Sequence, residues 1–397
     1  MEIAVHTIES ALSAQTLSYV PEFFKEIEKH MPHTLKEAPL EQFAKADFRL
    51  LFVASGGSEE GFLKEYELLT SKPCYILTSG ESNSLAASME ILSYLQNHGG
   101  RGEIIHGDPS LVAGRISALL AAAKAVSKLR GAKLGVVGKP SDWLIASEVD
   151  ENALKQKLGI ELVRVPMSEL FEEIEKNDYP ENEWTKKLLA CGYDEAEVKK
   201  ALGVYGAFRR IVDKYGLAGI TVRCFDLLGS VKTTGCLGLA ILNAEGVYGG
   251  CEGDIPSLIS MAVLGAISGE PVFMCNPSRI DTGSREMVFA HCTLPLNMPY
   301  ESSLTTHYES GIGVAIAGSI PEGPCTVFKT DGALERRFAA RGEIIANLRE
   351  KLLCRSQIKL KISPEAQCYF LREPINNHHL VCVGDWTSAC EEFFSML

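Results

Sequence analysis

The chain has 397 residues, of which 46% are hydrophobic and 23% charged, which is ordinary for a globular protein with a sizeable core. Its formal net charge is −12 and no cluster of lysine and arginine is visible, which argues against nucleic acid and anionic membranes as partners. No run approaches the roughly 18 apolar residues of a membrane span, the N-terminus lacks a secretory pattern, and the twelve cysteines include no C-x-x-C pair. We therefore expect a cytoplasmic protein with reduced thiols.

The first third of the chain alternates between apolar runs of strand length and segments in which apolar residues recur at helical spacing. The predicted elements are the strands Phe48–Ala54, Cys74–Thr78 and Glu103–Gly107 and the helices Ser82–His98 and Ser110–Leu129. This alternation predicts an α/β domain over residues 1–131, with a parallel sheet and helices on both faces. The loop Gly56-Gly57 lacks the spacing and the lysine of a phosphate-binding loop, so no nucleotide site is expected there.

A second alternating region predicts another Rossmann-like α/β domain, residues 132–268. Its predicted elements are the strands Lys133–Gly138, Trp143–Ala146, Leu162–Val165, Ala218–Cys224 and Leu237–Leu242 and the helices Met167–Lys176 and Ala196–Lys214. The segment Cys251-Glu252-Gly253-Asp254 lies between the predicted strand Leu237–Leu242 and the helix-like run Ile255–Ile267.

This acidic, glycine-containing segment follows a predicted buried strand and precedes a helix, which is where open α/β folds place ligand chemistry. An acid beside a glycine is, however, more often a turn residue or the N-terminal cap of a helix. Glu252 and Asp254 alone therefore do not establish a site.

The sequence pattern changes after Gly269, from alternating strands and helices to short β-like runs separated by turns rich in Gly, Pro, Asn and Asp. The predicted strands are Val272–Cys275, Met287–His291, Gly313–Ile316, Cys325–Lys329, Leu360–Ile362, Cys368–Leu371 and Leu380–Val383. They predict a β-rich, antiparallel and barrel-like domain over residues 269–397.

Histidines in this last domain, together with the Glu252 carboxylate, supply the kinds of side chain that bind metal ions. His291 ends an apolar run, where a single histidine is also compatible with a core position. His378 and His379 are adjacent, and neighbouring residues on a strand point to opposite faces, so one of them is expected to face a site. A carboxylate at Glu252 together with histidines from distant segments is the ligand inventory of a catalytic metal centre.

The C-terminal motifs, taken in order, resemble those of the L-fucose/L-arabinose isomerase superfamily, in its shorter fucose-isomerase-like branch. The matching segments are Cys251-Glu252-Gly253-Asp254-Ile255-Pro256, Pro271–Pro277, Ala290-His291-Cys292, Thr306–Gly311, Cys354–Gln357 and Asn377-His378-His379. The first third of the chain is similar to the family only in its α/β pattern. The resemblance implies two α/β domains, then a β-rich domain, with the active site between the second and third. It also implies one divalent ion, usually Mn²⁺.

The resemblance also assigns roles to residues of this chain. Glu252 matches the first metal carboxylate, which takes part in proton transfer, and His291 matches a metal histidine. The pair of His378 and His379 matches the C-terminal histidines, with His379 as the expected ligand, His378 as its catalytic neighbour, and a register open to a shift of one residue. Asn276 stands where the sugar isomerases carry their second carboxylate, so it is expected as a metal ligand in the active site.

The chemistry that the resemblance implies explains these residue types. An aldose and its ketose interconvert through an enediol, so one group takes a proton from the carbon beside the carbonyl and another moves a proton between the oxygens. A divalent ion acts as a Lewis acid on the oxygens. Hard oxygen ligands with one or two imidazoles suit Mn²⁺, or alternatively Mg²⁺ or Co²⁺. The expected function is therefore a metal-dependent aldose–ketose sugar isomerase, an intramolecular oxidoreductase.

Asn276 is the departure from the family pattern that matters, because an amide oxygen can ligate a cation but cannot act as a base. Asp281 or Glu309 is the alternative source of the missing catalytic carboxylate, and Asn276-Pro277 is also compatible with a simple turn. A second function class follows, namely a non-catalytic or differently catalytic sugar-binding homologue.

Four other residues are weaker candidates. Asp226 ends a predicted strand, as catalytic acids often do, but equally fits a helix cap. Lys232 and Arg223 suit an acidic substituent of a sugar, although solvated surface positions are commoner, and Trp143 suits either a sugar ring or a domain interface. The resemblance implies a homo-oligomer, a trimer or hexamer, and leaves open which sugar is bound and whether it carries a phosphate or sulfonate.

Overall fold

The computed structural model describes residues 2–10 and 16–397. It contains two parallel sheets and a closed antiparallel barrel, which confirms the predicted α/β class with a β-rich, barrel-like C-terminal part. The chain forms two compact units, Met1–Ser127 and Lys128–Leu397. The predicted second and third domains both lie in the second unit.

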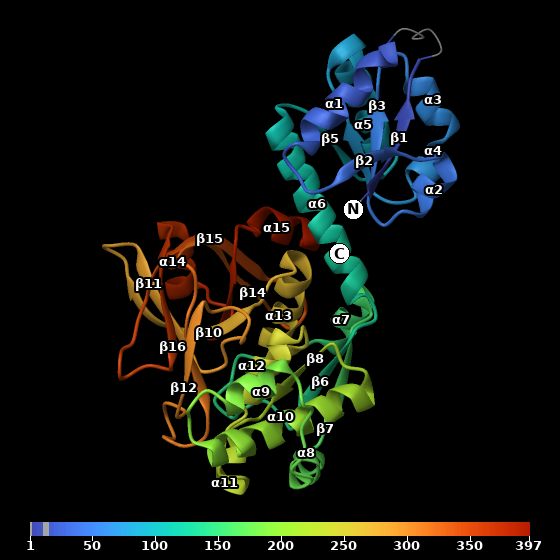
Figure 1. Cartoon of the computed structure of the whole chain (residues 1–397). Helices are drawn as coiled ribbons and strands as arrows, with labels where there is room; N and C mark the ends of the chain where they lie inside the picture. The colour runs from blue at the N-terminus through green and yellow to red at the C-terminus, as the bar shows by residue number, and fades with distance from the viewer. Residues whose placement is uncertain (1, 11–15) are drawn as a thin grey trace. The chain divides into compact units, whose positions relative to one another are not determined.

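The first unit is a five-stranded parallel sheet in the order β2-β1-β3-β4-β5, with helices on both faces (Figure 1). The strands are β1 (Glu2–Ile8), β2 (Thr34–Glu37), β3 (Arg49–Val53), β4 (Cys74–Leu77) and β5 (Gly102–Ile105). The helices are η1 (Thr16–Tyr19), α1 (Val20–Glu28), α2 (Leu40–Lys45), α3 (Glu59–Lys64), α4 (Tyr66–Leu69), η2 (Glu81–Asn83), α5 (Ser84–Asn97) and α6 (Pro109–Leu129).

The core of this unit forms because its central strand is apolar on both faces. β3 is buried along its whole length, as a strand covered on both sides should be. Helices α2 to α5 pack against one face through side chains that include Phe43, Phe62, Leu69 and Ile91. On the other face, Phe24 of α1 meets the ring of Phe52 edge-on, with 5.1 Å between ring centroids.

Helix α6 is the one described helix that is long and apolar enough to cross a membrane by length and composition, with a mean hydropathy of 1.3 over a window that is 39% buried. This is weak evidence, since the core helix of a soluble protein has the same properties. Arg115 of α6 also forms an ion pair with Glu103 of β5, at 2.5 Å.

The second unit begins with a four-stranded parallel sheet in the order β7-β6-β8-β9. Its strands are β6 (Lys133–Val137), β7 (Glu161–Val165), β8 (Gly219–Val222) and β9 (Tyr248–Gly250). The helices are α7 (Glu151–Leu158), α8 (Met167–Glu175), α9 (Glu183–Leu189), α10 (Glu195–Tyr215), α11 (Asp226–Ser230), α12 (Cys236–Ala244) and α13 (Ile255–Ser268).

The rest of this unit is a closed barrel with the strand order β10-β11-β16-β15-β14-β17, in which every pair is antiparallel. The barrel strands are β10 (Phe273–Asp281), β11 (Glu286–His291), β14 (Gly323–Thr330), β15 (Arg337–Asn347), β16 (Ser356–Ile362) and β17 (His379–Val383). The remaining elements are the hairpin β12 (Glu301–Thr305) and β13 (Ala315–Ser319) and the helices α14 (Pro364–Arg372) and α15 (Thr387–Ser395). A register shift between Pro277 and Arg279 accommodates the proline within β10.

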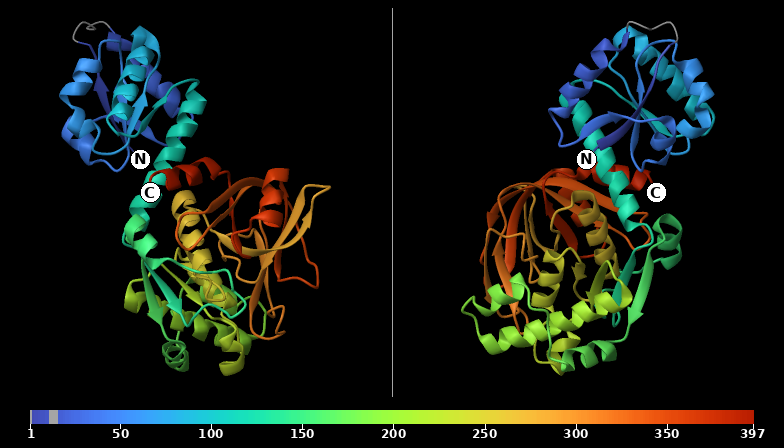
Figure 2. Two further views of the ribbon diagram at one scale, coloured as in Figure 1. Left: turned by 180° about the vertical axis from the view of Figure 1, so that it is seen from behind. Right: turned by 45° about the vertical axis from the view of Figure 1, so that its right-hand side comes forward.

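Helix α13 joins the parallel sheet to the barrel. It packs against β8 and β9 of the sheet and against β14 and β17 of the barrel, and it is the yellow helix between the green and orange elements in Figure 2. Nearly all of its residues are buried, which explains why it is apolar all round. The loop that carries Glu252 lies at its N-terminus and therefore faces the region where sheet and barrel meet.

Three predicted strands are wrong. Leu237–Leu242 lies in α12, which is buried on all sides, and a short apolar run of this kind does not distinguish a buried helix from a buried strand. Cys368–Leu371 lies in α14, whose cap Ser363 and first residue Pro364 are helix-start signals. Trp143–Ala146 forms no strand, and the strand that leads to Glu252 is β9.

Candidate functional site

A strained backbone holds Glu252 at the start of α13. Glu252 and Gly253 have φ angles of 62° and 69°, in the left-handed region that costs a non-glycine residue about 1–3 kcal/mol. Asp254 then caps α13, and its Oδ1 accepts a hydrogen bond from the backbone N–H of Ser257 at 2.9 Å. The indole Nε1 of Trp143 donates to Oε2 of Glu252 at 2.6 Å. Cap and indole together fix where this carboxylate lies.

Two barrel segments bring imidazoles to the same place. His291 is the last residue of β11, is 4% exposed, and its Nδ1 lies 2.8 Å from the hydroxyl of Thr293. His378 directly precedes β17, is fully buried, and its Nδ1 lies 2.8 Å from Oδ2 of Asp254. The two imidazole rings are nearly perpendicular, with 5.6 Å between their centroids.

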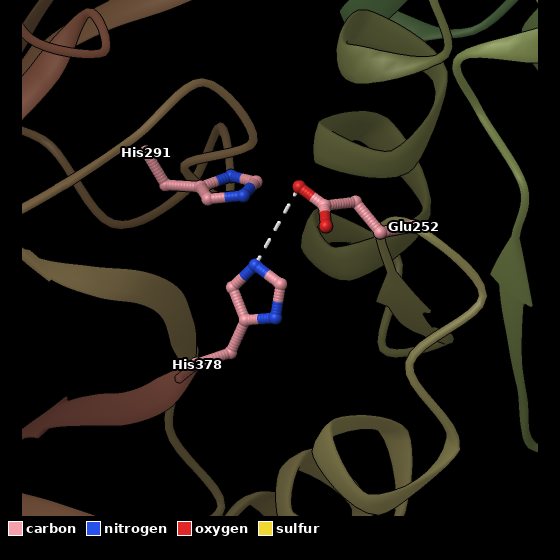
Figure 3. Close-up of side chains that lie close together, drawn as sticks. All are labelled: Glu252, His291 and His378. Atoms are coloured by element: carbon pink, nitrogen blue, oxygen red, sulfur yellow. Dashed lines mark ion pairs between the residues drawn. The ribbon is translucent and has the colours of Figure 1, made fainter. Parts of the chain in front are cut away.

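Glu252, His291 and His378 form a group suited to a cation, in which one donor atom from each residue lies within 4.8 Å of the others. Figure 3 shows the carboxylate and both rings converging, with Oε1 of Glu252 3.7 Å from Nε2 of His378. That Nε2 is buried and has no hydrogen-bond partner. A buried nitrogen without a partner, beside a carboxylate and a second imidazole, fits a divalent metal ion.

The charges within the group follow from burial and from its close contacts. Burial raises the pKa of Glu252, but the nearby charge of His378 and the hydrogen bond from Trp143 outweigh it and leave the pKa below its usual value. Burial lowers the pKa of His378, but Asp254 and Glu252 raise it to about 9. Burial lowers the pKa of His291 to about 3. Near neutral pH the metal-free group therefore holds a carboxylate, an imidazolium and a neutral imidazole.

The structure places His379, the expected ligand, outside this group. Its Nε2 lies 2.9 Å from the hydroxyl of Tyr369 and its Nδ1 lies 3.0 Å from the carbonyl of Asn377. Its ring also packs against Phe370, with 4.6 Å between centroids. Both ring nitrogens of His379 already have partners, so the structure brings His378, and not the expected His379, to Glu252 and His291. Which of the two histidines binds a metal stays a prediction.

Asn276 lies near the group but is not shown to belong to it. In the sheet, Asn276 of β10 pairs with Ala290 of β11, which directly precedes His291. The residue before Asn276, Cys275, pairs with His379 of β17. Its Oδ1 lies 3.5 Å from the side-chain nitrogen of Asn377. A role for Asn276 as a metal ligand stays a prediction.

Asp281 does not fit the catalytic role proposed for it. It lies exposed at the turn between β10 and β11, where its Oδ1 accepts hydrogen bonds from the backbone N–H groups of Gly283 and Ser284. Five residues of strand separate it from Asn276, or about 16 Å at 3.3 Å per residue. Asp281 thus stabilises a turn, and a catalytic role for it stays a prediction that this position does not favour.

Glu309 and His307 approach the group from the loop between β12 and β13. Burial raises the pKa of Glu309, and the nearby charge of Glu252 raises it further. His307 is 9% exposed, and its ring meets that of Phe225 edge-on, which in turn meets Trp143 edge-on. Sequence reasoning missed His307, although it stands two residues before Glu309 in a motif that the resemblance singled out.

The basic candidates have different environments. Arg223 is engaged, since its guanidinium donates to Asp142 at 2.7 Å and to Asp226 at 3.1 Å. That pairing also accounts for Asp226 without a catalytic role. Lys232 is exposed, at a position with φ of 57°. A role for Arg223 in binding an acidic substituent would require the guanidinium to leave two carboxylates.

The chain is similar to three curated proteins named sulfoquinovose isomerase. It is 24% identical over 262 residues to those of Priestia aryabhattai and Priestia megaterium (strain ATCC 12872 / QMB1551), which covers 62% of this chain and 58% of each relative. It is 25% identical over 187 residues to that of Clostridium sp. (strain MSTE9), which covers 45% of this chain and 41% of the relative. No protein-family model matches the chain. The chain thus spans little more than half the length of the two Priestia relatives and less than half that of the Clostridium relative, and all three are named as isomerases of one sugar.

Proposed function

We propose that the protein is a metal-dependent aldose–ketose isomerase of a small sugar. The observation that carries this proposal is the group of Glu252, His291 and His378, in which three distant segments offer one carboxylate and two imidazoles. Similarity to sulfoquinovose isomerases supports the same reaction class. Because sulfoquinovose is a hexose that carries a sulfonate, sulfonated hexoses are the first substrates to test.

In this proposal Glu252, His291 and His378 hold the cation, with Mn²⁺ as the expected ion and Asn276 as a further oxygen ligand. When bound, the cation supplies Lewis-acid polarisation of the sugar's carbonyl and neighbouring hydroxyl oxygens. Trp143, which is 51% exposed, keeps the Glu252 carboxylate oriented through its indole N–H.

Proton transfer requires a base and an acid, and two carboxyl groups in this region have pKa values shifted in opposite directions. The pKa of Glu252 lies below its usual value, so this group stays a carboxylate that can take the proton from the carbon beside the sugar's carbonyl. The pKa of Glu309 lies above its usual value, because of burial and the charge of Glu252, so it holds a proton more readily. Such opposed shifts mark an acid–base pair. We therefore assign the second catalytic role to Glu309 in place of Asp281.

The test is isomerisation of sulfoquinovose by the full-length protein, with Mn²⁺ added and solvent-deuterium uptake into the sugar followed by NMR. Glu252→Gln should lower both Mn²⁺ affinity and turnover. Glu309→Gln should leave Mn²⁺ affinity unchanged and lower turnover by about 10²–10⁴-fold, the usual contribution of one acid–base group. Asp281→Asn is the matched control and should retain turnover, because Asp281 lies at an exposed turn.

Wild-type turnover in both glutamate variants would refute the proposed roles.

Asn276 favours a second candidate function, a sugar-binding protein without isomerase activity, because an amide cannot act as the base that a second carboxylate would supply. If the wild type binds Mn²⁺ and sugar yet incorporates no deuterium, the protein is a sugar-binding homologue. A panel that includes glucose and glucose 6-phosphate then separates a requirement for sulfonate from a general preference for anionic or neutral hexoses.

A further inference from the structure

A buried lysine lies behind the candidate metal centre. Lys329 of β14 is 0% exposed, and its ammonium donates a hydrogen bond to the hydroxyl of Ser257 at 2.6 Å. Burying an ammonium group is costly unless it is paired or hydrogen-bonded, so lysines are rarely found fully buried. Lys329 therefore needs an explanation that its position in a barrel strand alone does not supply.

The hydrogen bonds continue from Lys329 to the metal group. The hydroxyl of Ser257 donates to Oδ2 of Asp254 at 2.7 Å, and the same oxygen lies 2.8 Å from Nδ1 of His378. Asp254, Ser257 and His378 are all 0% exposed. Four buried side chains from α13, β14 and the segment before β17 thus form one continuous chain, which ends at the ring of His378.

The chemistry of Lys329 and of the Asp254 carboxylate fixes the direction of each hydrogen bond in this chain. An ammonium group can only donate, so Oγ of Ser257 must accept from it and is left to donate its own hydrogen to Asp254. Because a carboxylate only accepts, Nδ1 of His378 must carry a hydrogen and donate it to Asp254. Nε2 then faces Glu252, and in Figure 3 it lies toward that carboxylate while Nδ1 lies away from it.

We propose that Lys329 is a positioning residue for the candidate metal centre, acting through Ser257 and Asp254 to hold His378 with Nδ1 bonded and Nε2 directed at the cation. This inference rests on the proposed function, because it takes His378 as a metal ligand. Groups that orient a ligating histidine typically change metal affinity about 10–100-fold when they are removed.

The test combines two variants and one control in the full-length protein. Lys329→Met removes the ammonium group, and Ser257→Ala interrupts the chain while leaving Lys329 in place. Lys361→Met, on the exposed face of β16, is the matched control. Mn²⁺ affinity is measured by calorimetry, and Co²⁺ absorption spectra report the geometry of the centre. Proton NMR of the metal-free protein reports the hydrogen-bonded Nδ1–H of His378, whose downfield signal is assigned by its loss in His378→Gln.

The expected result is an affinity about 10–100-fold lower in both Lys329→Met and Ser257→Ala, with altered Co²⁺ spectra and a shifted or rapidly exchanging Nδ1–H signal. Lys361→Met should match the wild type in all three. If Lys329→Met does not fold, Ser257→Ala decides the matter. Unchanged affinity and an unchanged Nδ1–H signal in Ser257→Ala overturn the positioning role. A wild type that binds neither Mn²⁺ nor Co²⁺ overturns the proposed metal centre itself, which is a separate failure.

Discussion

The loop that carries Glu252 offers a controlled test of how tightly the candidate site is built, because α13 is flanked by two glycines with the same left-handed φ angle. Gly253 precedes the helix and Gly269 ends it, and both have φ of 69°. A side chain added at Gly269 meets nothing within 4 Å. A side chain added at Gly253 would place its Cβ 2.5 Å from the carbonyl oxygen of Lys139 and 2.9 Å from the Cα of Pro140.

Replacing each glycine by alanine should therefore have unequal effects. Gly269→Ala should cost about 1–2 kcal/mol, the penalty of a left-handed backbone for a residue with a Cβ. Gly253→Ala carries the same penalty plus the cost of overpacking against a backbone that cannot easily move, about 1–3 kcal/mol more. The sum is about 2–5 kcal/mol. Since the displaced loop carries Glu252, Mn²⁺ affinity should fall at least about tenfold in Gly253→Ala and stay unchanged in Gly269→Ala.

Urea unfolding followed by tryptophan fluorescence measures these costs selectively. The three tryptophans, Trp143, Trp184 and Trp386, all lie in the unit Lys128–Leu397, so the signal reports that unit alone. Calorimetry with MnCl₂ gives the affinities. Equal losses of stability in the two variants, or an unchanged affinity in Gly253→Ala, would refute the view that close packing of this loop positions Glu252.

Four further outcomes are expected. Mn²⁺ affinity should rise about tenfold per pH unit from about pH 6.5 to 8.5, because the pKa of His378 is about 9 and its proton competes with the cation at lower pH; an affinity that is flat over this range in calorimetry contradicts this. His378→Gln should abolish Mn²⁺ binding while His379→Gln retains it, and the reverse pattern would restore the original choice of ligand. Asn276→Asp should tighten Mn²⁺ binding by adding a negative ligand; no change places residue 276 outside the coordination sphere. Light scattering should show a homo-oligomer, a trimer or hexamer, and a stable monomer at micromolar concentration would count against that expectation.

Elements with a clear period or strong turn signals could be predicted from the sequence. The apolar runs that became β3, β6 and β8 are flanked by helical segments, and this alternation was enough to predict parallel sheets. It failed for α12, where burial on every side removes the polar face that identifies a helix. The long strand β15 was missed because Arg337–Asn347 is half-buried and mixes alanine with charged residues, so it has neither an apolar run nor a strict alternation.

Some residues of the candidate site could likewise be predicted from the sequence, and others could not. Glu252 and His291 could be singled out because Glu252 stands in a loop before a helix and His291 ends an apolar run of strand length. The choice between His378 and His379 could not be made, because adjacent residues at the start of a strand differ only in which face they point to. The environment of Glu309 was equally inaccessible, since it depends on a loop that brings it near the charge of Glu252 across 57 residues of chain.

Asp254 explains how the proposed ligands Glu252 and His378 would be held in place even though residue 276 is an asparagine and not a second carboxylate. Its two oxygens serve different elements, since Oδ1 caps α13 and Oδ2 receives the hydrogen bonds of Ser257 and His378. The residue that ends the Glu252 loop is therefore also the residue that orients an imidazole from the barrel. Any shift of the loop relative to the barrel would break a hydrogen bond to a fully buried carboxylate, a loss that typically costs several kcal/mol. The side chain of Asp254 thus sets the spacing between the Glu252 carboxylate and the His378 ring. We therefore expect the lack of a carboxylate at residue 276 to weaken cation binding less than it weakens proton transfer.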